Sequence, residues 1–563
     1  MVTRAQAIAQ LTAPGEPLEL ETTNLYGRQC RRFKNAPPTL RELFEQSRSD
    51  ATFLVYQAQR YSFEQTYQIS CAIGGLLVDE YGIGRGDRVA ISMRNFPEWI
   101  TAFMAVTSVG GIAVALNAMW QSDELEYGLS DSGAKVLFAD QERLDRLAGG
   151  SDGLSTRVIA VRPTNTPPTG CAELGQLLAD RPPRAMPAVA LAPTDDALIL
   201  YTSGSTGHPK GAVSCHLNVI SALVSWELDA EAALLASGDD PPELEHQRAT
   251  LLAVPLFHVT GSHAVFLHSF RQQRKIVSMY KWDPEAGAEL IETERISSFI
   301  APAAMTGDLV QTAQVSARDL SSLMVVGGGG APRAPQQVRQ IDASFRNALP
   351  GTGWGMTETN AIGTGIGGED YLDRPDSSGR CSAVLDLRIV REDGTALPAG
   401  ERGQLQVRGT SVIQGYWNRP DANAEAFAED GWLRTGDVAY IDDEGFLFVV
   451  DRHKDLVIRG GENIGCGQVE AALLEHPMVL EAAVYAVPDD RLGEEVGATV
   501  YCTAVVDEQA LRVFLASRLA KFEIPRYFSI TADPLPRIAS GKIFKRRLRD
   551  QAAARLTAGD SPS

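Results

Sequence analysis

The chain has 563 residues, of which 44% are hydrophobic and 22% charged, and its net charge is −19. This length predicts roughly three to four domain-sized units with room for a large core. The acidic balance argues against nucleic-acid binding, because counterion release needs an extended basic surface.

The cysteines and the N-terminus bear on where the protein works. The seven cysteines are widely spaced and form no CxxC pair, which is typical of a reducing compartment and predicts no structural zinc. The N-terminal stretch contains prolines and glutamates and has no apolar region of the kind that a signal peptide needs. We therefore predict a cytoplasmic protein.

Short apolar runs alternate with helical segments between residues 40 and 140, for example at 88–93 and 111–115. This alternation is typical of βαβ units and predicts an α/β fold. The apolar run 100–116 is interrupted by two glycines, so we expect a buried helix, turn and strand there and no stable membrane insertion. Four later apolar runs, each ending at Gly, Ser, Thr or Pro, are predicted strands: 197–201, 250–254, 298–301 and 323–326.

The pattern changes in three later regions. An acidic, proline-containing stretch at 229–247 is predicted to be a surface insertion. Residues 384–440 contain short β-like runs between Asp-Gly and Pro-Ala-Gly turns, which predicts a small β-rich subdomain. A new α/β pattern starts after residue 454 and indicates a separate, smaller domain. Its predicted helices are 469–474 and 510–519, and its predicted strands are 482–486 and 496–502.

The strongest local motif is Tyr201-Thr-Ser-Gly-Ser-Thr-Gly-His-Pro-Lys-Gly211, directly after an apolar strand. Its glycines let backbone amides approach an anion, while hydroxyl groups and Lys210 add donors. It is not a Walker A loop, because Pro209 precedes the lysine and no Ser or Thr follows. A flexible surface turn would not explain these donors at fixed positions. The motif predicts a phosphate cradle made of Thr202, Ser203, Gly204, Ser205, Thr206, Gly207 and Lys210.

With this motif the sequence resembles the ANL superfamily of adenylating enzymes, which includes acyl-CoA synthetases, nonribosomal peptide adenylation domains and firefly luciferase. The resemblance extends over nearly the whole chain, and further segments follow in the family's order. These are Pro255-Leu-Phe-His258, Gly329-Gly-Ala-Pro332, Gly353-Trp-Gly-Met-Thr-Glu358, Gly431-Trp-Leu-Arg-Thr-Gly-Asp437, Asp451-Arg-His-Lys-Asp455, Gly460-Gly-Glu-Asn463 and Pro536-Arg-Ile-Ala-Ser-Gly-Lys542.

The resemblance implies an N-terminal AMP-binding domain at 1–450, a hinge at 451–454 and a mobile C-terminal lid domain at 455–563. Lys454 falls at the family's hinge position. Rotation about it would present two faces of the lid to one active site. The family's usual glycine before the arginine of the hinge is Asp451 here, which bears on the detailed hinge geometry.

The resemblance also implies where ATP binds. Trp354 would stack on the adenine, although the family more often has Tyr there. Thr357 would contact the α-phosphate and Glu358 would hold Mg²⁺, whereas a plain helix N-terminus is the local alternative. Asp437 and Arg452 would bind the ribose, with a surface turn pair as the alternative. The backbone around the base would be that of Gly329, Gly330, Ala331, Gly353 and Gly355.

Three further assignments come from the resemblance. Lys542 would be the catalytic lysine that bridges the carboxylate and the α-phosphate, although its surroundings alone predict a basic, solvated C-terminal helix. Gly460 and Gly461 would let pantetheine pass the backbone, with a simple β-turn as the alternative. His258 would act as a gate between the acid pocket and the thiol tunnel, and a satisfied core histidine is the alternative.

The reaction implied is an ATP-dependent acid:CoA ligation through an acyl-adenylate, with ATP, Mg²⁺ and CoA as ligands. Residues 258–263, 301–305 and 327–330, which should line the acid pocket, contain no acidic or strongly basic side chain. A hydrophobic acid of fatty, aryl or steroid type is therefore favoured. Loading of a separate carrier protein and a non-catalytic ATP-binding regulator are the alternatives. The sequence leaves the acid, a homo-oligomer and peripheral membrane contact open.

Overall fold

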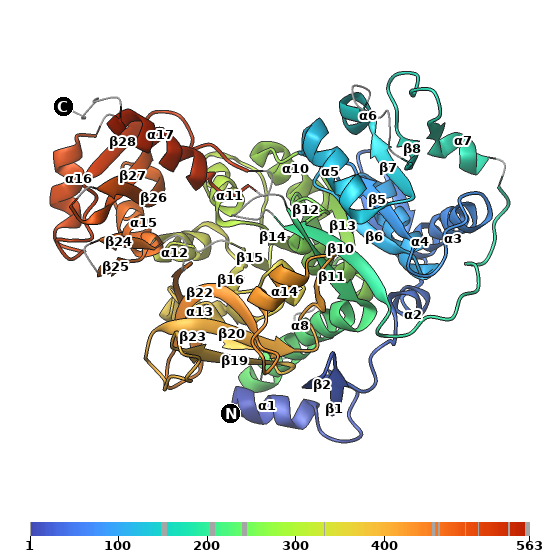
Figure 1. Cartoon of the computed structure of the whole chain (residues 1–563), viewed down its shortest axis with the longest axis horizontal. Coiled ribbons are helices and arrows are strands. Elements are labelled where there is room, and N and C mark those ends of the chain that lie inside the picture. Colours follow the sequence, from blue (N-terminus) through green and yellow to red (C-terminus); the bar gives the residue numbers. More distant parts are fainter. Residues whose placement is uncertain are drawn as a thin grey trace.

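The structure is a computed structural model. It describes residues 2–147, 155–179, 181–202, 209–238, 245–330, 333–452, 456–459, 462–489, 491–504, 506–538 and 541–557. Figure 1 shows a large body that carries the elements up to strand β23 and a smaller lobe at one end that carries those from β24 onward. The chain is a mixed α/β protein with a large N-terminal part and a small C-terminal part, as predicted.

The first large sheet has eight strands, parallel in its centre, and both of its faces are buried. Val89 and Ile91 of β5 point into the main core with helices α3 and α4, whereas Ala90 faces a second core with α5 and α6. Burial on both faces explains why these strands are uniformly apolar. The strand order is β21 (Gly415–Tyr416), β11 (Lys210–Cys215), β10 (Asp196–Thr202), β6 (Ile112–Ala115), β5 (Arg88–Ser92), β7 (Val136–Asp140), β8 (Arg157–Val161) and β9 (Ala172–Glu173).

Helices cover this sheet on both sides. Residues 97–108 form α4, in which Pro97 occupies the first turn and every residue except Glu98 is buried. The predicted helix, turn and strand at 100–116 are thereby confirmed as α4 followed by β6. The helices of this part are α2 (Leu40–Gln46), α3 (Phe63–Asp79), α4 (Pro97–Ser108), α5 (Ser122–Ser132), α6 (Gln141–Leu147) and α7 (Leu174–Ala179).

The second large sheet has thirteen strands and joins the α/β part to the β-rich part. Its strands β13, β12, β14, β15 and β16 run parallel, and the strands from β17 onward run antiparallel. The order is β19 (Leu385–Val390), β20 (Gly403–Gly409), β22 (Leu433–Ile441), β23 (Phe446–Arg452), β18 (Gly379–Cys381), β17 (Thr364–Gly367), β16 (Leu349–Gly353), β15 (Val325–Gly329), β14 (Ser298–Ile300), β12 (Ala249–Leu252), β13 (Lys275–Ser278), β3 (Thr52–Tyr56) and β4 (Gln59–Ser62).

The antiparallel strands of this sheet confirm the predicted β-rich subdomain, and one predicted strand has different bounds in the structure. The run 323–326 was predicted to be a strand, but β15 extends through three glycines to Gly329, because β14 and β16 pair with it on either side. The helices that accompany the sheet are α8 (His216–Ser237), the π-helix η1 (Thr260–Leu267), α9 (His268–Arg271), α10 (Pro284–Glu294), α11 (Ala303–Val315), α12 (Pro335–Ser344), the 3₁₀ helix η2 (Thr357–Thr359), α13 (Gly368–Asp373) and α14 (Pro420–Ala426).

The prediction of a surface insertion at 229–247 is wrong for its first part, which continues helix α8. Asp229 accepts a hydrogen bond from Arg4 at 2.7 Å, and Ala232 is buried. Arg4 belongs to the N-terminal helix α1 (Arg4–Leu11), which precedes the hairpin of β1 (Leu20–Leu25) and β2 (Arg28–Phe33). The stretch is rich in Ala and Leu, which favour helix, and Gly238 in the left-handed region ends it.

The C-terminal part has its own hydrophobic core, built from β24, β26, β27, α15 and α16. Helix α15 begins at Cys466, which is 1% exposed and packs in this core. The predicted helix 510–519 runs instead from 508 to 515. The elements are β24 (Val457–Arg459), β25 (Glu462–Ile464), α15 (Cys466–Leu474), β26 (Val479–Asp489), β27 (Gly493–Cys502), α16 (Glu508–Leu515), β28 (Tyr527–Thr531) and α17 (Lys545–Thr557).

Among the described helices, none is both long enough and apolar enough to cross a membrane.

Candidate active site

The predicted nucleotide residues lie at the ends of parallel strands. Strands β15 and β16 are neighbours, and Gly329 at the end of one pairs with Gly353 at the end of the other. Strand β10 of the first sheet ends at Thr202. Ligand sites in open α/β sheets form outside the carboxyl ends of strands, so the fold supports a site at this edge.

Trp354 is held by its polar edge. Its Nε1 donates a hydrogen bond to Oδ2 of Asp437 at 2.8 Å, and Arg452 Nε lies 3.3 Å from Oδ1 of the same carboxylate. Asp437 is 4% exposed, and its burial raises the pKa of the carboxyl, while Arg452 and the indole hydrogen bond oppose this shift. The indole makes this bond in the plane of its ring. The predicted base platform, Trp354, and the predicted ribose ligand, Asp437, are therefore hydrogen-bonded to each other.

Close backbone packing explains two of the predicted glycines. A Cβ atom at Gly353 would lie 2.3 Å from the carbonyl oxygen of Thr364, and one at Gly355 would lie 2.2 Å from that of Ala361. No side chain fits at either distance. The turn that carries Trp354 is therefore pressed against the returning strand β17.

Glu358 lies in the short helix η2 and is 7% exposed. Its backbone oxygen accepts a hydrogen bond from Ile413 N at 2.9 Å. Its Oε1 accepts a hydrogen bond of 2.7 Å from the hydroxyl of Tyr416. In the described part of the chain, no three His, Cys, Asp or Glu side chains gather as a metal site. A Mg²⁺ ion at Glu358 would therefore take other oxygen ligands such as phosphates, which is its usual mode of binding to nucleotides.

Tyr416 is a site residue that the sequence did not reveal. It lies in β21, which pairs with β11, and the Nζ atom of Lys210 lies 5.4 Å from its ring centroid. Tyr416 thus connects Lys210, the predicted phosphate lysine, to Glu358, the predicted metal ligand. Glu358 precedes Tyr416 by 58 residues in the chain. The local signal, an aromatic residue after Gly415, was too weak to identify it.

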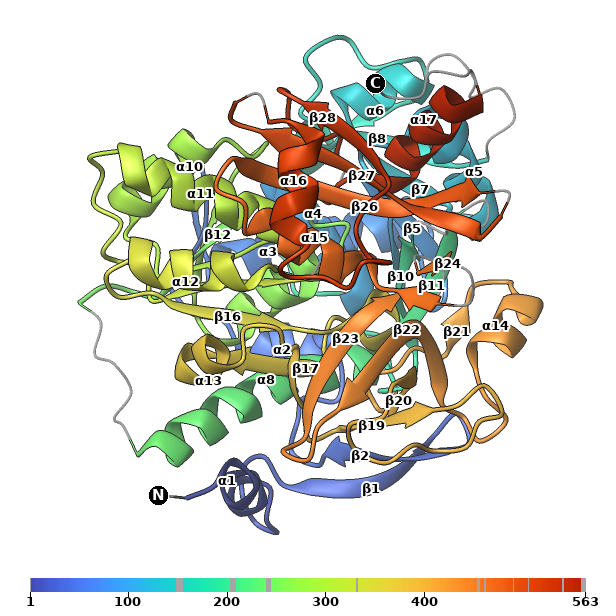
Figure 2. The ribbon, with the colours of Figure 1, turned by 90° about the vertical axis from the view of Figure 1, so that its left-hand side faces the viewer.

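The C-terminal part brings Lys542 to this site. A Cβ atom at Gly330 would lie 3.5 Å from Nζ of Lys542, and one at Gly541 would lie 3.7 Å from Sδ of Met305. Figure 2 shows the C-terminal lobe lying across the face of the large body. The lysine is preceded by Gly541 at φ 82°, a left-handed turn that suits glycine.

The electrostatic surroundings of Lys542 are unusual for a lysine. Burial and the nearby positive charge of Arg452 lower the pKa of Lys542 to about 8, and Asp437 partly offsets this. Lys545, three residues later, instead forms an ion pair of 2.6 Å with Glu470. Helix α17 begins at Lys545 and exposes Arg546, Arg547 and Arg549, whereas Lys542 lies in the turn before this helix.

His258 lies two residues before the π-helix η1, which begins at Thr260. Its Nε2 is buried and has no hydrogen-bond partner among the described residues. Burial, together with the charge of Lys542, lowers the pKa of His258 to about 4 and keeps the ring neutral at pH 7. The π-helix packs tightly here, since a Cβ atom at Gly261 would lie 2.2 Å from the oxygen of Pro255. Helices of this type often mark functional sites.

Several predicted residues lie outside the described part of the chain, and their roles stay predictions. They are Ser203, Gly204, Ser205, Thr206, Gly207, Ala331, Lys454, Gly460 and Gly461. The two ends of the predicted phosphate cradle are described. Thr202 Oγ1 donates a hydrogen bond to the backbone oxygen of Lys210 at 3.3 Å, which joins them.

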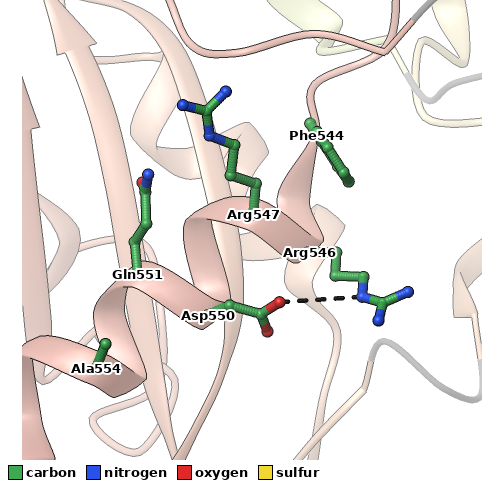
Figure 3. Close-up of a pocket in the computed structure, with 6 residues that line it drawn as sticks. All are labelled: Phe544, Arg546, Arg547, Asp550, Gln551 and Ala554. Carbon is green, nitrogen blue, oxygen red and sulfur yellow. Dashed lines mark ion pairs between the residues drawn. The ribbon is translucent and has the colours of Figure 1, made fainter. Parts of the chain in front are cut away.

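Figure 3 shows a hollow on the surface of α17. Its lining contains none of the predicted site residues, and Arg546 and Asp550 face each other across it at 3.9 Å. The hollow is lined by Phe544, Arg546, Arg547, Asp550, Gln551 and Ala554.

Comparisons with known proteins agree with this geometry. Residues 41–417 match the family model described as AMP-binding enzyme, and residues 468–542 match the AMP-binding enzyme C-terminal domain. A long-chain-fatty-acid–CoA ligase of Mycobacterium tuberculosis is 34% identical over 84% of this chain and 90% of its own length. A 4-coumarate–CoA ligase of Oryza sativa is 30% identical, with 90% of each chain covered.

Solved structures show the same fold. The o-succinylbenzoate–CoA synthetase of Bacillus subtilis, in complex with ATP and magnesium ion, superimposes with a TM-score of 0.76. It is 27% identical, and the match covers 92% of this chain and 99% of that one. The same synthetase has also been solved with its acyl-adenylate intermediate. The chain belongs to the AMP-binding enzyme family and is an ATP-dependent, AMP-forming acid–CoA ligase that acts through an acyl-adenylate.

Proposed function

We propose that this ligase activates a hydrophobic carboxylic acid of fatty, aryl or steroid type, with Lys542, Glu358 and the Trp354–Asp437 pair as its principal groups. The observation that carries the proposal is the position of Lys542. This lysine comes from the C-terminal part, yet it lies against Gly330 at the end of β15. An ammonium group brought from a separate lobe to a nucleotide loop is well suited to bridge two anionic reactants.

In the first half-reaction, a carboxylate oxygen of the acid attacks the α-phosphorus of ATP, and pyrophosphate leaves with the electrons of the broken P–O bond. The side chains of Lys542 and Thr357 would stabilise the charge on the α-phosphate and the attacking carboxylate. Trp354 and Asp437 would orient the adenosine, which fixes the reacting atoms in line. A Mg²⁺ ion held by Glu358 would neutralise phosphate charge.

In the second half-reaction, the CoA thiolate attacks the acyl carbonyl carbon, the bond from that carbon to the phosphate oxygen breaks, and AMP leaves. We propose that rotation about the hinge at 451–454, centred on Lys454, replaces Lys542 by the face that carries Gly460 and Gly461. His258 would gate the path of the thiol. Closure of the lid would keep water from the adenylate.

The proposed domain boundaries, 1–450 and 455–563, are supported by the packing. The main core and the core of the C-terminal part share no residue. Two separate cores connected by a short segment are what we expect of a lid domain that moves as a rigid body.

The hydrophobic nature of the acid is supported by the described wall residues. Ala301 and Met305 are buried, and no acidic or strongly basic side chain occurs in 258–263, 301–305 or 327–330. A second carboxylate or an ammonium group on the substrate would therefore have no opposite charge on these segments. The fatty-acid and coumarate ligases named above act on acids of the proposed kind.

The test is pyrophosphate release across a panel of fatty, aryl and steroid acids, with and without CoA, for the wild type and Lys542→Ala. Loss of one preorganised donor costs about 2.7–4 kcal/mol, so the variant should release pyrophosphate at least about a hundredfold more slowly. Acyl-CoA formation from a supplied acyl-adenylate should survive. Turnover only with a loaded carrier protein, or no pyrophosphate with any acid, would contradict the proposal.

A further inference from the structure

A chain of buried polar side chains runs from the π-helix η1 to the turn that carries Glu358. Ser262 Oγ lies 2.9 Å from His263 Nδ1, and His263 Nε2 lies 3.0 Å from Asn360 Oδ1. Asn360 Nδ2 then donates to the backbone oxygen of Ser411 at 2.9 Å. All three side chains are 0% exposed. We call Ser262, His263 and Asn360 the relay; none of its members is accessible to a substrate.

The hydrogens of the relay can be assigned from its ends. The oxygen of Ser411 can only accept, so the amide nitrogen of Asn360 faces it and the amide oxygen faces His263. His263 therefore donates from Nε2 and accepts at Nδ1. His263 Nδ1 and the backbone oxygen of His258, which lies 3.0 Å from Ser262 Oγ, are then both acceptors for the single proton of the Ser262 hydroxyl. Burial lowers the pKa of His263 to about 4, in agreement with this neutral form.

The turn held by the relay is strained. Asn360 and Ala361 have φ values of 56° and 67°, so two consecutive residues other than glycine are left-handed. Each costs roughly 1–2 kcal/mol, and such conformations persist only where the surroundings fix them. The two hydrogen bonds of the Asn360 amide provide that restraint. Because Asn360 directly follows η2, they also fix the direction of the helix that carries Glu358.

We propose that the relay positions Thr357 and Glu358 for adenylate formation, with His263 as a positioning residue that does not touch the substrate. This inference rests on the roles proposed above for Thr357 and Glu358. The relay also reaches the backbone of His258, and so it joins the predicted acid-pocket wall to the predicted metal ligand. Thioester formation needs no metal bridging the phosphates of ATP, so we expect the relay to affect it less than adenylate formation.

Three variants distinguish the effect of the relay's hydrogen bonds from the effect of side-chain packing. His263→Phe keeps a planar ring and removes both nitrogens. His263→Gln keeps one donor for Asn360. Asn360→Gly keeps the left-handed backbone without strain and removes the amide. His216→Phe is the matched control, because His216 is 1% exposed and its Nδ1 accepts a hydrogen bond of 3.2 Å from Leu40 N, in another part of the core.

The experiment measures both half-reactions of each variant and the binding of Mn²⁺ in the presence of a non-hydrolysable ATP analogue. His263→Phe and Asn360→Gly should slow pyrophosphate release about 10- to 100-fold and weaken Mn²⁺ binding, as losses around metal ligands do. Acyl-CoA formation from a supplied acyl-adenylate should be slowed less than pyrophosphate release. His263→Gln should recover most of the loss, and His216→Phe should affect neither the metal nor the ratio of the half-reactions.

Equal losses in the two half-reactions, or unchanged Mn²⁺ binding in both His263→Phe and Asn360→Gly, would overturn the relay. If His263→Phe fails to fold, Asn360→Gly alone decides. Failure of the proposed function has a different signature, because the wild type itself would then release no pyrophosphate. The Mn²⁺ measurement still judges the relay in that case, since it needs no turnover.

Discussion

Tyr416 connects two residues that are predicted to bind the phosphates and the metal, Lys210 and Glu358. Its hydroxyl donates to Glu358, and its ring faces the ammonium group of Lys210. This hydrogen bond orients the carboxylate of Glu358 even before a metal binds. Burial and the neighbouring Glu358 raise the pKa of Tyr416 above its ordinary value, so the hydroxyl keeps its proton for this bond.

We expect Tyr416→Phe to raise the Mg²⁺ concentration needed for half-maximal pyrophosphate release about tenfold, because metal affinity follows the orientation of the ligands. A Mg²⁺ titration of the first half-reaction measures this. Tyr67→Phe is the control, since it removes a comparable bond of 3.1 Å to Glu45 away from the site. An unchanged Mg²⁺ requirement in Tyr416→Phe would show that Glu358 needs no such support.

The lowered pKa of Lys542 predicts the pH dependence of adenylation. The ammonium form is the one that stabilises phosphate charge, and it is lost as the pH rises through about 8. Therefore kcat/KM for pyrophosphate release should fall above about pH 8. Arg452→Gln should move this limb to higher pH, because the charge of Arg452 lowers the lysine's pKa. A profile that stays flat to pH 10 in the wild type would contradict the assignment.

The turn between β16 and β17 is an element whose conformation depends on close backbone contact. Gly355→Ala would place a methyl group 2.2 Å from the oxygen of Ala361. Overpacking of this kind costs about 1–3 kcal/mol. We expect Gly355→Ala to weaken ATP binding and to lower the midpoint of urea unfolding. Gly365→Ala, which has no heavy atom within 4 Å of the added carbon, should leave both unchanged; similar losses in the two variants would refute this.

The elements that the sequence predicted well are those with a strong local pattern. The apolar runs of β10 and β12 and the helices α4 and α15 follow from periodicity alone. The stretch 229–247 was predicted to be a surface insertion because its charges suggested exposure to solvent. Asp229 instead pairs with Arg4 of the N-terminal helix α1. The Trp354–Asp437 bond and the relay join residues 83 and 97 positions apart. Such contacts leave no trace in local spacing, and only the folded chain shows them.

At the scale of the whole molecule, the site is divided between two cores. Trp354, Asp437 and Glu358 belong to the large part, while Lys542 comes from the lobe with its own core. This division would allow one pocket to serve the two proposed half-reactions in turn. It also means that the chemistry of the first step can be removed without disturbing most of the nucleotide site.

A chain that ends at Arg452 keeps the ion pair of that residue with Asp437 and removes the lobe that carries Lys542. We expect it to fold and to bind ATP, because the main core is complete without the C-terminal part. Pyrophosphate release should fall by at least about a hundredfold, as for Lys542→Ala. Circular dichroism and ATP titration measure the first two properties. Aggregation of the shortened chain on synthesis would show that the two cores depend on each other.

The buried Nε2 of His258 has a consequence for the choice of acid. Within the described part of the chain this nitrogen has no hydrogen-bond partner; a buried polar atom in that state costs about 1–3 kcal/mol, and an acid that bonded to it in the proposed pocket would recover that free energy. Between two acids of equal bulk, the one that reaches this nitrogen gains roughly a 5- to 150-fold advantage in affinity. Discrimination among acids would then depend on atoms close to the carboxyl group as much as on the length of the apolar tail.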